Sequence, residues 1–216
     1  MNNALVRAQA ALELELWEAL HRAATEAIAE DPEESFGYYY LSAAESGLGR
    51  PSEALEAARE AVARRPDDRG HRQLLSRALY ACGALEEAEL EAREAVRLCP
   101  EEPDPWRTLA EALSAHGKTS EAITAATHGL GLRPEYPELI GILGRLLMAT
   151  DPERSEELHR RALSIDADSD LDLNNLGCAQ LAQRRPYEAA LSFREALRVN
   201  PALALAQRNL QKPCAP

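Results

Sequence analysis

The sequence predicts an all-α fold of about six helical hairpins, and three observations support this prediction. Prolines recur at one fixed spacing, at Pro32, Pro66, Pro100 and Pro134, and Pro201 follows after two further repeats less one residue. Leucines and small residues recur in register with these prolines, and glycines recur midway between them. A fixed period of about 34 residues is that of one helix–turn–helix unit in a stacked array.

The residues at matching positions of the repeats have matching chemistry. A leucine near the middle of each first helix is followed by a small residue, as in the pairs Leu41–Ser42, Leu75–Ser76, Leu109–Ala110, Leu143–Gly144 and Leu176–Gly177. Each second helix carries two small residues seven positions apart, beginning with Ala54 and Ala61. Large residues fill the space between helices, while small ones let two helix axes approach to about 8 Å.

Glycines and prolines mark the predicted ends of the helices. Gly49, Gly83 and Gly117 lie midway through units two to four, where a first helix is expected to end on a left-handed residue. The recurring prolines close each second helix, because proline cannot continue it. Each unit is therefore predicted to be a helix, a short turn, a second helix and another short turn. The predicted units span residues 1–34, 35–68, 69–102, 103–136, 137–169 and 170–203.

The first unit departs from this pattern, since only its second half is in register. Its first helix is expected to be an atypical cap that carries Leu12, Leu14, Leu16 and Trp17. The fifth unit lacks one residue, and there Asp151 can cap a helix whose first residue is Pro152. A tighter turn is expected at this point. After the sixth unit, residues 202–210 can form one capping helix, and residues 211–216 are expected to fray.

These columns resemble the tetratricopeptide repeat family. The last unit resembles it most closely, with "LNNLGCAQLAQRRPYEAALSFREALRVNP" over residues 173–201. Unit four matches through Trp106, Leu109, Ala110, Gly117, Glu121, Ala122, Gly129 and Pro134. The resemblance covers roughly residues 1–203. It implies a single right-handed α-solenoid over residues 1–210 and an interaction role in place of catalysis.

Composition points away from several classes of function. The net charge of −12 repels nucleic acid and anionic membranes at long range. The five histidines and four cysteines show no metal-ligand or redox spacing, and no phosphate loop or nucleophile–base pair is present in the sequence. We therefore predict no enzyme activity and no cofactor. Charged residues interrupt the N-terminal segment, and no apolar run is long enough to cross a membrane, so a cytoplasmic protein with free thiols is expected.

The resemblance also implies where a partner would bind, because the first helices of such repeats line a concave groove. Carried over by repeat position, the inward side chains include three arginines, two tyrosines and several polar residues. The predicted groove residues are Tyr39, Gln73, Arg77, Tyr80, Arg107, Glu111, Arg145, Met148 and Asn174, and the same positions in the last unit add Cys178 and Leu181.

Arg77, Arg107 and Arg145 make this lane basic inside an acidic protein. Arginine binds carboxylates in a bidentate fork, so an acidic peptide segment or a chain-terminal carboxylate is one candidate ligand. The alternative for Arg107 is a structural pair with Glu111 four residues later. The lysine and asparagine clamp of the family branch that binds chaperone tails is absent, since Lys118 is the only lysine before the tail.

An aromatic segment, "FGYYY", spans residues 36–40. Tyr38 is expected in the core and Tyr39 in the groove. Phe36 and Tyr40 are expected to pack against the first unit, and otherwise to form an exposed anchor. The predicted function is a non-catalytic adaptor that holds a protein partner. Two alternatives are self-association through the tail helix or the aromatic segment, and a regulatory module of a longer protein.

Overall fold

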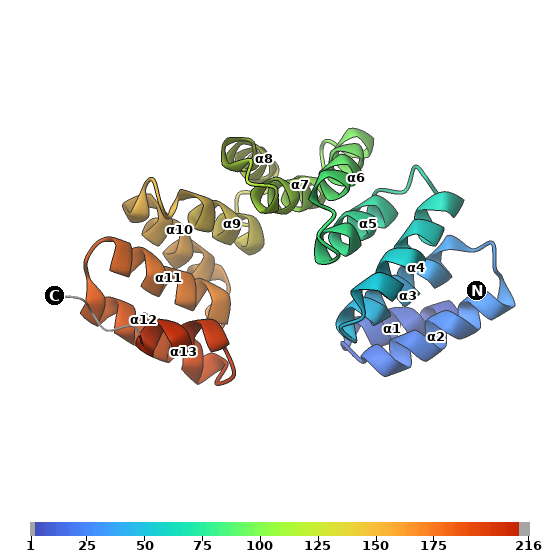
Figure 1. Ribbon diagram of the computed structural model, residues 1–216, viewed down its shortest axis with the longest axis horizontal. Coiled ribbons are helices and arrows are strands. Elements are labelled where there is room, and N and C mark those ends of the chain that lie inside the picture. Colours follow the sequence, from blue (N-terminus) through green and yellow to red (C-terminus); the bar gives the residue numbers. More distant parts are fainter. Residues whose placement is uncertain (1–2, 212–216) are drawn as a thin grey trace. The chain divides into compact units, whose positions relative to one another are not determined.

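The structure is a computed structural model that describes residues 3–211, and within this range the secondary structure consists of thirteen α-helices with no strand (Figure 1). It confirms the predicted all-α solenoid class. The helices are α1 (Asn3–Glu13), α2 (Trp17–Glu30), α3 (Ser35–Gly47), α4 (Pro51–Arg64), α5 (Arg69–Ala81), α6 (Leu85–Leu98), α7 (Pro103–Ala115), α8 (Thr119–Leu132), α9 (Pro137–Leu147), α10 (Pro152–Ile165), α11 (Asp170–Ala182), α12 (Pro186–Val199) and α13 (Ala204–Gln211).

The chain divides into two compact units, an N-terminal unit of Met1–Lys118 and a C-terminal unit of Thr119–Pro216. The N-terminal unit contains α1 to α7, and the C-terminal unit contains α8 to α13. Within each unit the helices pack mainly on their neighbours in sequence, as in the pairs α3 with α4, α5 with α6, and α11 with α12. This neighbour-to-neighbour packing is what a stacked repeat requires.

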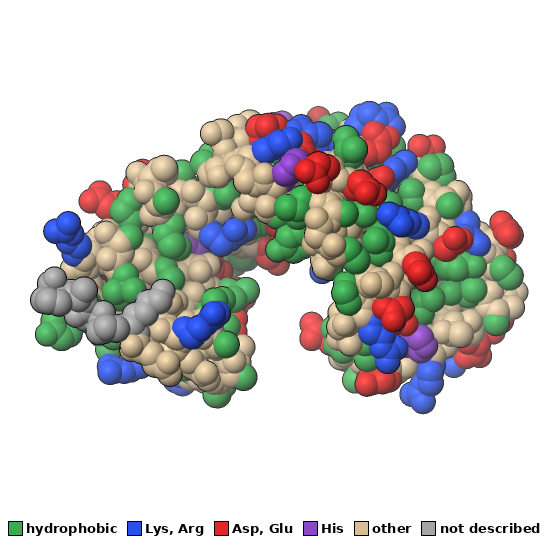
Figure 2. Space-filling model, in the orientation of Figure 1, with side chains coloured by type: hydrophobic (Ala, Val, Ile, Leu, Met, Phe, Trp, Pro, Cys, Tyr) green, Lys and Arg blue, Asp and Glu red, His purple; other side chains and the backbone are tan. Residues whose placement is uncertain are grey.

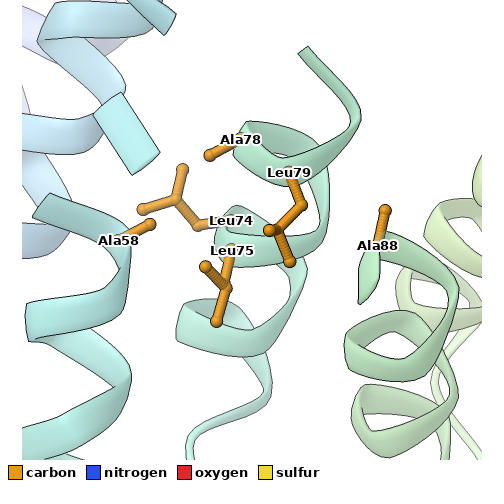
Figure 3. Packing of buried hydrophobic residues seen from close by; sticks show 6 residues of the cluster. All are labelled: Ala58, Leu74, Leu75, Ala78, Leu79 and Ala88. Atoms are coloured by element: carbon orange, nitrogen blue, oxygen red, sulfur yellow. The ribbon is translucent and has the colours of Figure 1, made fainter. Parts of the chain in front are cut away.

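Small residues and leucines form the core, as the repeat columns predicted. In the N-terminal unit, Leu74, Leu75 and Leu79 of α5 pack with Ala58 of α4 and Ala88 of α6 (Figure 3). The small residues of the second helices are fully buried at successive repeats, as expected where two helices approach closely. This column contains Ala54, Ala88, Ala122, Ser155 and Ala189.

The small residue that follows each leucine of the first helices, called a notch below, contacts different groups in different repeats. Ser42 and Ser76 donate hydrogen bonds to the carbonyls of Ala54 and Ala88, at 2.8 and 2.7 Å. At Gly177, the site that a Cβ would occupy is 2.6 Å from Phe193 Cε1. These small residues therefore fix the packing of α3 on α4, α5 on α6 and α11 on α12.

The predicted left-handed turns are confirmed, but the tighter turn expected before Pro152 is not found, because residues 148–151 separate α9 from α10 whereas only residues 48–50 separate α3 from α4. Gly49, Gly83 and Gly117 have φ angles of 74°, 79° and 77°, in the left-handed region. Asp151 caps α10 by accepting a hydrogen bond from the backbone N–H of Arg154 at 3.0 Å, and Pro152 is the first helical residue. In the sixth unit the left-handed position is filled by a non-glycine residue, Arg184, with φ of 60°.

The first hairpin corrects one prediction. Leu12 lies in α1, which ends at Glu13, so Leu14 and Leu16 lie in the turn and are exposed. Trp17 is not part of the first helix, because it opens α2 and lies over Gly47. The turn residue Glu15 has a left-handed φ of 52°, which breaks the helix between the two leucines. The predicted capping helix is α13. The tail predicted to fray was residues 211–216, but Gln211 is the last residue of α13, and residues 212–216 lie outside the described residues.

Candidate interaction site

A pocket lies on the N-terminal unit, where the first helices of three successive hairpins meet. Its lining residues come from α3, α5 and α7, and its volume is about 150 Å³. Small-molecule sites usually enclose roughly 300–1,000 Å³, so this pocket has the size of a side-chain subsite. The lining residues are Tyr39, Arg69, Gly70, Gln73, Leu74, Arg77, Asp104 and Arg107. Four of the predicted groove residues, Tyr39, Gln73, Arg77 and Arg107, are thus brought together.

Tyr39 forms an aromatic wall of this pocket. Its ring centroid lies 5.4 Å from that of Tyr40, 5.6 Å from that of His71 and 6.2 Å from that of Phe36. Burial raises the pKa of the Tyr39 hydroxyl above its usual value, and the nearby charge of Arg77 opposes this shift without reversing it. The wall is therefore held by its aromatic neighbours and uncharged at neutral pH.

Arg77 supplies a positive charge that the fold does not neutralise. Its side chain is exposed, and it has no ion-pair partner among residues 3–211. One turn earlier on α5, Gln73 Nε2 donates a hydrogen bond to Thr108 Oγ1 of α7 at 3.2 Å. Asp104 adds an acceptor on the α7 side. The pocket thus places a free guanidinium beside an aromatic ring.

The other two arginines of the pocket have acidic partners. Arg107 Nη1 lies 2.8 Å from Glu111 Oε1, which confirms the structural alternative predicted for this pair. Arg69 Nη2 lies 3.8 Å from Glu102 Oε2. The basic lane is therefore partly balanced within the fold. On the visible face of the N-terminal unit, acidic and basic side chains are likewise interspersed (Figure 2).

The remaining predicted groove residues fall into two groups. Tyr80 is exposed on α5 one turn after Arg77, while Arg145 is exposed on α9 and Met148 is half-buried at the end of that helix. The prediction that Asn174 faces an open groove is wrong, because Asn174 is only 3% exposed. Its Oδ1 accepts a hydrogen bond from Asn209 Nδ2 at 3.0 Å.

Helix α13 covers this part of the last repeat. Asn209 Nδ2 also lies 3.5 Å from Cys178 Sγ, and Leu181 packs in the same cluster as Ala206 of α13. The inward positions of the last repeat are therefore filled by the chain itself and are not open to a partner. The sequence predicted a capping helix over residues 202–210, but it did not indicate which residues this helix would cover.

The aromatic segment is packed within the chain. Tyr40 lies against the cluster formed by Ala8, Ala11 and Leu20, as predicted. Phe36 differs from the prediction, since its ring is 5.1 Å from His71 in the following hairpin, with the Arg65 guanidinium 5.3 Å from its centroid.

Tyr38 is half-buried instead of fully buried. The Arg64 guanidinium lies 3.9 Å from its ring centroid, and Arg64 Nη2 donates to the Tyr38 hydroxyl at 3.0 Å. This polar partner for the hydroxyl explains why Tyr38 stays near the surface.

A buried carboxylate, Glu89, was not among the predicted site residues. Glu89 is 6% exposed, with its oxygens 2.8 Å from Lys118 Nζ, 2.6 Å from His116 Nδ1 and 3.0 Å from Arg93 Nε. Burial raises the pKa of Glu89, but the hydrogen bonds from Lys118, His116 and Arg93 outweigh it and lower the pKa to about 2. This carboxylate holds the turn after α7.

Glu156 repeats this arrangement in the C-terminal unit. It follows Glu89 by two repeats less one residue, and it accepts hydrogen bonds from Gln183 Nε2 at 2.7 Å and Arg185 Nη1 at 2.6 Å. Burial raises the pKa of Glu156, but the bonds from Gln183, Arg160 and Arg185 lower it overall. Gln183 and Arg185 follow His116 and Lys118 by the same interval. This shared spacing is the sequence signal that could have identified both sites.

Residues 3–211 offer little to other kinds of site. No group of three or more potential metal ligands occurs in this part of the chain. None of the helices in it is long and apolar enough to cross a membrane. Cys82, Cys99 and Cys178 are free thiols, and Cys214 lies outside the described residues.

The hairpins, their small-residue notches and their left-handed turns define a tetratricopeptide-repeat fold. No family model and no curated protein matches the chain. Solved structures show the same fold. The Cut9–Hcn1 hetero-tetramer of the APC/C matches with a TM-score of 0.87 and 14% identity over 97% of this chain and 42% of that one.

Two further solved structures match this chain over most of their own length. TTC0263, a thermophilic tetratricopeptide-repeat protein of Thermus thermophilus, matches with a TM-score of 0.74 and 21% identity, over 82% of this chain and 97% of that one. PilF of Pseudomonas aeruginosa matches with a TM-score of 0.74 and 17% identity, over 95% of this chain and 94% of that one. At these identities the likeness establishes the fold.

Proposed function

We propose that this protein is a non-catalytic scaffold that holds a segment of a partner protein against α3, α5 and α7. The observation that carries the proposal is the unpaired Arg77 beside the aromatic wall of Tyr39 in a pocket of side-chain size. A stacked repeat of this type offers an extended open surface, which suits a peptide or helix.

The chemistry of the pocket favours an acidic side chain of the partner. A carboxylate can accept two hydrogen bonds from the Arg77 guanidinium, and its methylene groups can lie on the Tyr39 ring. The net charge of −12 disfavours nucleic acid as the partner. The free thiols support a reducing compartment such as the cytoplasm.

The other predicted groove residues extend this site along the same helices. Exposed Tyr80 lies one turn beyond Arg77 on α5, and Glu111 lies one turn beyond Arg107 on α7. Tyr80 is of a residue type enriched at interaction hot spots. In the C-terminal unit, Arg145 of α9 and Met148, which follows the last residue of that helix, are proposed to contact a further part of the partner.

The test is affinity capture from a lysate of the source organism, followed by binding measurements on synthetic peptides from the captured protein. Arg77→Glu is expected to weaken binding of the cognate peptide at least tenfold, with an unchanged helical circular dichroism spectrum. Arg22→Glu is the matched control, because Arg22 is exposed on α2 and has no ion pair among the described residues. Equal affinity for wild type and Arg77→Glu would contradict the proposal.

Self-association is a second candidate function. The surfaces first expected to mediate it do not support it, since α13 and the aromatic segment are both packed against their own chain. A different pair of surfaces does support it.

A further inference from the structure

An exposed apolar face lies on α12 of the C-terminal unit. Tyr187 and Leu191 are 88% and 64% exposed, and Arg194 follows them at the i, i+4, i+7 spacing that places all three on one helix face. Arg194 is exposed, and so is Arg184 in the preceding turn, and neither has an ion pair among the described residues. We call Arg184, Tyr187, Leu191 and Arg194 the basic patch.

Among the second helices compared, the position of Tyr187 is apolar only in the last repeat. At the position of Tyr187, the earlier second helices carry small polar or acidic residues, as expected for a solvated face. These residues are Ser52, Glu86, Ser120 and Glu153. Tyrosine and arginine are also among the residue types most enriched at interaction hot spots. The repeat pattern alone therefore does not account for Tyr187 on this face.

A second exposed apolar group lies at the α1–α2 turn of the N-terminal unit. Leu14 and Leu16 are 68% and 52% exposed, held apart by the left-handed backbone of Glu15. Glu13 and Glu18 flank them and are also exposed. We call Glu13, Leu14, Glu15, Leu16 and Glu18 the acidic patch. It belongs to the segment of residues 1–34, which carries two basic and eight acidic residues.

The two patches are complementary to one another. Each presents two large apolar side chains, and the charges without an ion pair around them are opposite in sign. Glu188 and Glu195 also lie beside Leu191 on α12, but they are paired with Arg185 and Arg198. Neither Glu15 nor Glu18 has an ion pair among the described residues, just as Arg184 and Arg194 have none. Opposite charges around an apolar centre both steer association and fix its register.

We propose that the protein self-associates head to tail, with the basic patch of one copy docked on the acidic patch of the next. The two patches are different surfaces, so the contact is heterologous. In an open assembly, the copy at one end has a free basic patch and the copy at the other end has a free acidic patch. The contact can therefore repeat and build chains or closed rings.

The test begins with multi-angle light scattering of the wild type over a concentration series. The average mass is expected to rise above the 23.7 kDa of one chain with increasing concentration. It should fall back as ionic strength approaches about 1 M, where the screening length is about 3 Å. A constant mass of one chain throughout the series would overturn the proposal.

Two variants then test the direction of the contact. Leu191→Glu disables the basic patch and Leu14→Arg disables the acidic patch, and each variant alone is expected to remain a monomer. An equimolar mixture should form a species of twice the chain mass, because each variant keeps one working patch. If each variant is monomeric and their mixture also stays monomeric, the head-to-tail contact is wrong.

Matched controls exclude a general effect of a new surface charge. Leu90→Glu changes a 65% exposed leucine at the same repeat position on α6, and Val6→Arg changes a 48% exposed residue of α1. Both are expected to associate like the wild type. Loss of association in Leu90→Glu would contradict the assignment of the contact to α12.

Discussion

Lys118 Nζ lies 2.8 Å from Oε2 of Glu89, so the last residue of the N-terminal unit is bound to a buried carboxylate of α6. Each partner comes from a different hairpin of the repeat. The bond therefore joins two neighbouring hairpins, and His116 of the same turn adds a second contact. Small residues alone do not hold this junction together.

Glu89→Gln is expected to lower the stability of the protein. Removing one partner of a buried ion pair costs about 3–5 kcal/mol, and partial exposure of Lys118 reduces this to about 2 kcal/mol. For a chain of this length the melting temperature should fall by about 4–8 °C, which circular dichroism can measure. Glu87→Gln is the control, since Glu87 is exposed and its ion pair with Arg59, at 3.4 Å, lies at the surface. An equal loss in both variants would contradict a special role for Glu89.

The contribution of Glu89 should depend on pH. Its pKa in the folded protein is about 2, below the ordinary 4.5, so its ionised form stabilises the folded state. This stabilisation is complete above about pH 4.5 and is lost as the pH falls through about 2. The difference in melting temperature between wild type and Glu89→Gln should therefore shrink over this window. A difference that stays constant from pH 7 to pH 2 would show that the carboxylate is not ionised in the folded protein.

Arg184→Gly should stabilise the protein. Arg184 has a φ of 60°, where a side chain costs about 1–2 kcal/mol, whereas glycine fills the matching position at Gly117. The greater freedom of glycine in the unfolded chain offsets about half of this gain, so a net increase of about 0.5–1 kcal/mol is expected in chemical denaturation. Arg194→Gly, inside α12, should instead destabilise by about 1 kcal/mol. A loss of stability in Arg184→Gly would mean that its side chain makes a compensating contact.

A methyl group added at Gly177 should destabilise the last hairpin. The added Cβ would lie 2.6 Å from Phe193 Cε1, and overpacking of this kind costs about 1–3 kcal/mol. Gly131→Ala in α8 provides the opposite control, because a Cβ there meets no atom within 4 Å. That substitution should raise stability by about 0.5–1 kcal/mol. Thermal unfolding of both variants checks the pair, and a stable Gly177→Ala would show that Phe193 can move aside.

The repeat columns predicted the helices well because they depend on local spacing. The period of the prolines, the glycines at the turns and the Asp151 cap are local signals, and each appears in the structure where it was expected. The break at Glu15 was missed, because apolar residues run through it without a glycine or proline.

The candidate site was predicted only in part, because side-chain partners across hairpins depend on tertiary packing. The spacing of Tyr39, Gln73, Arg77 and Arg107 placed them on one surface, and they line one pocket. By its position in the repeat, Asn174 was expected to face the groove like those four residues. It is buried instead, because α13 packs over it. The role of Glu89 depends on Lys118, which lies in the next hairpin.

Glu89 and Glu156, which occupy equivalent positions and each bind side chains of the next hairpin, also affect how the chain unfolds. In a repeat protein, unfolding spreads from one hairpin to the next, and its extent depends on the strength of each junction. The junction between α4 and α5 is joined through the apolar cluster that holds Ala58 and Leu74, whereas the two glutamate junctions would each leave a buried charge unpaired on opening. Fraying from the C-terminal end should therefore slow at Glu156, and fraying from the N-terminal end should slow first at buried Glu45, which contacts His21 of the first hairpin, and then at Glu89.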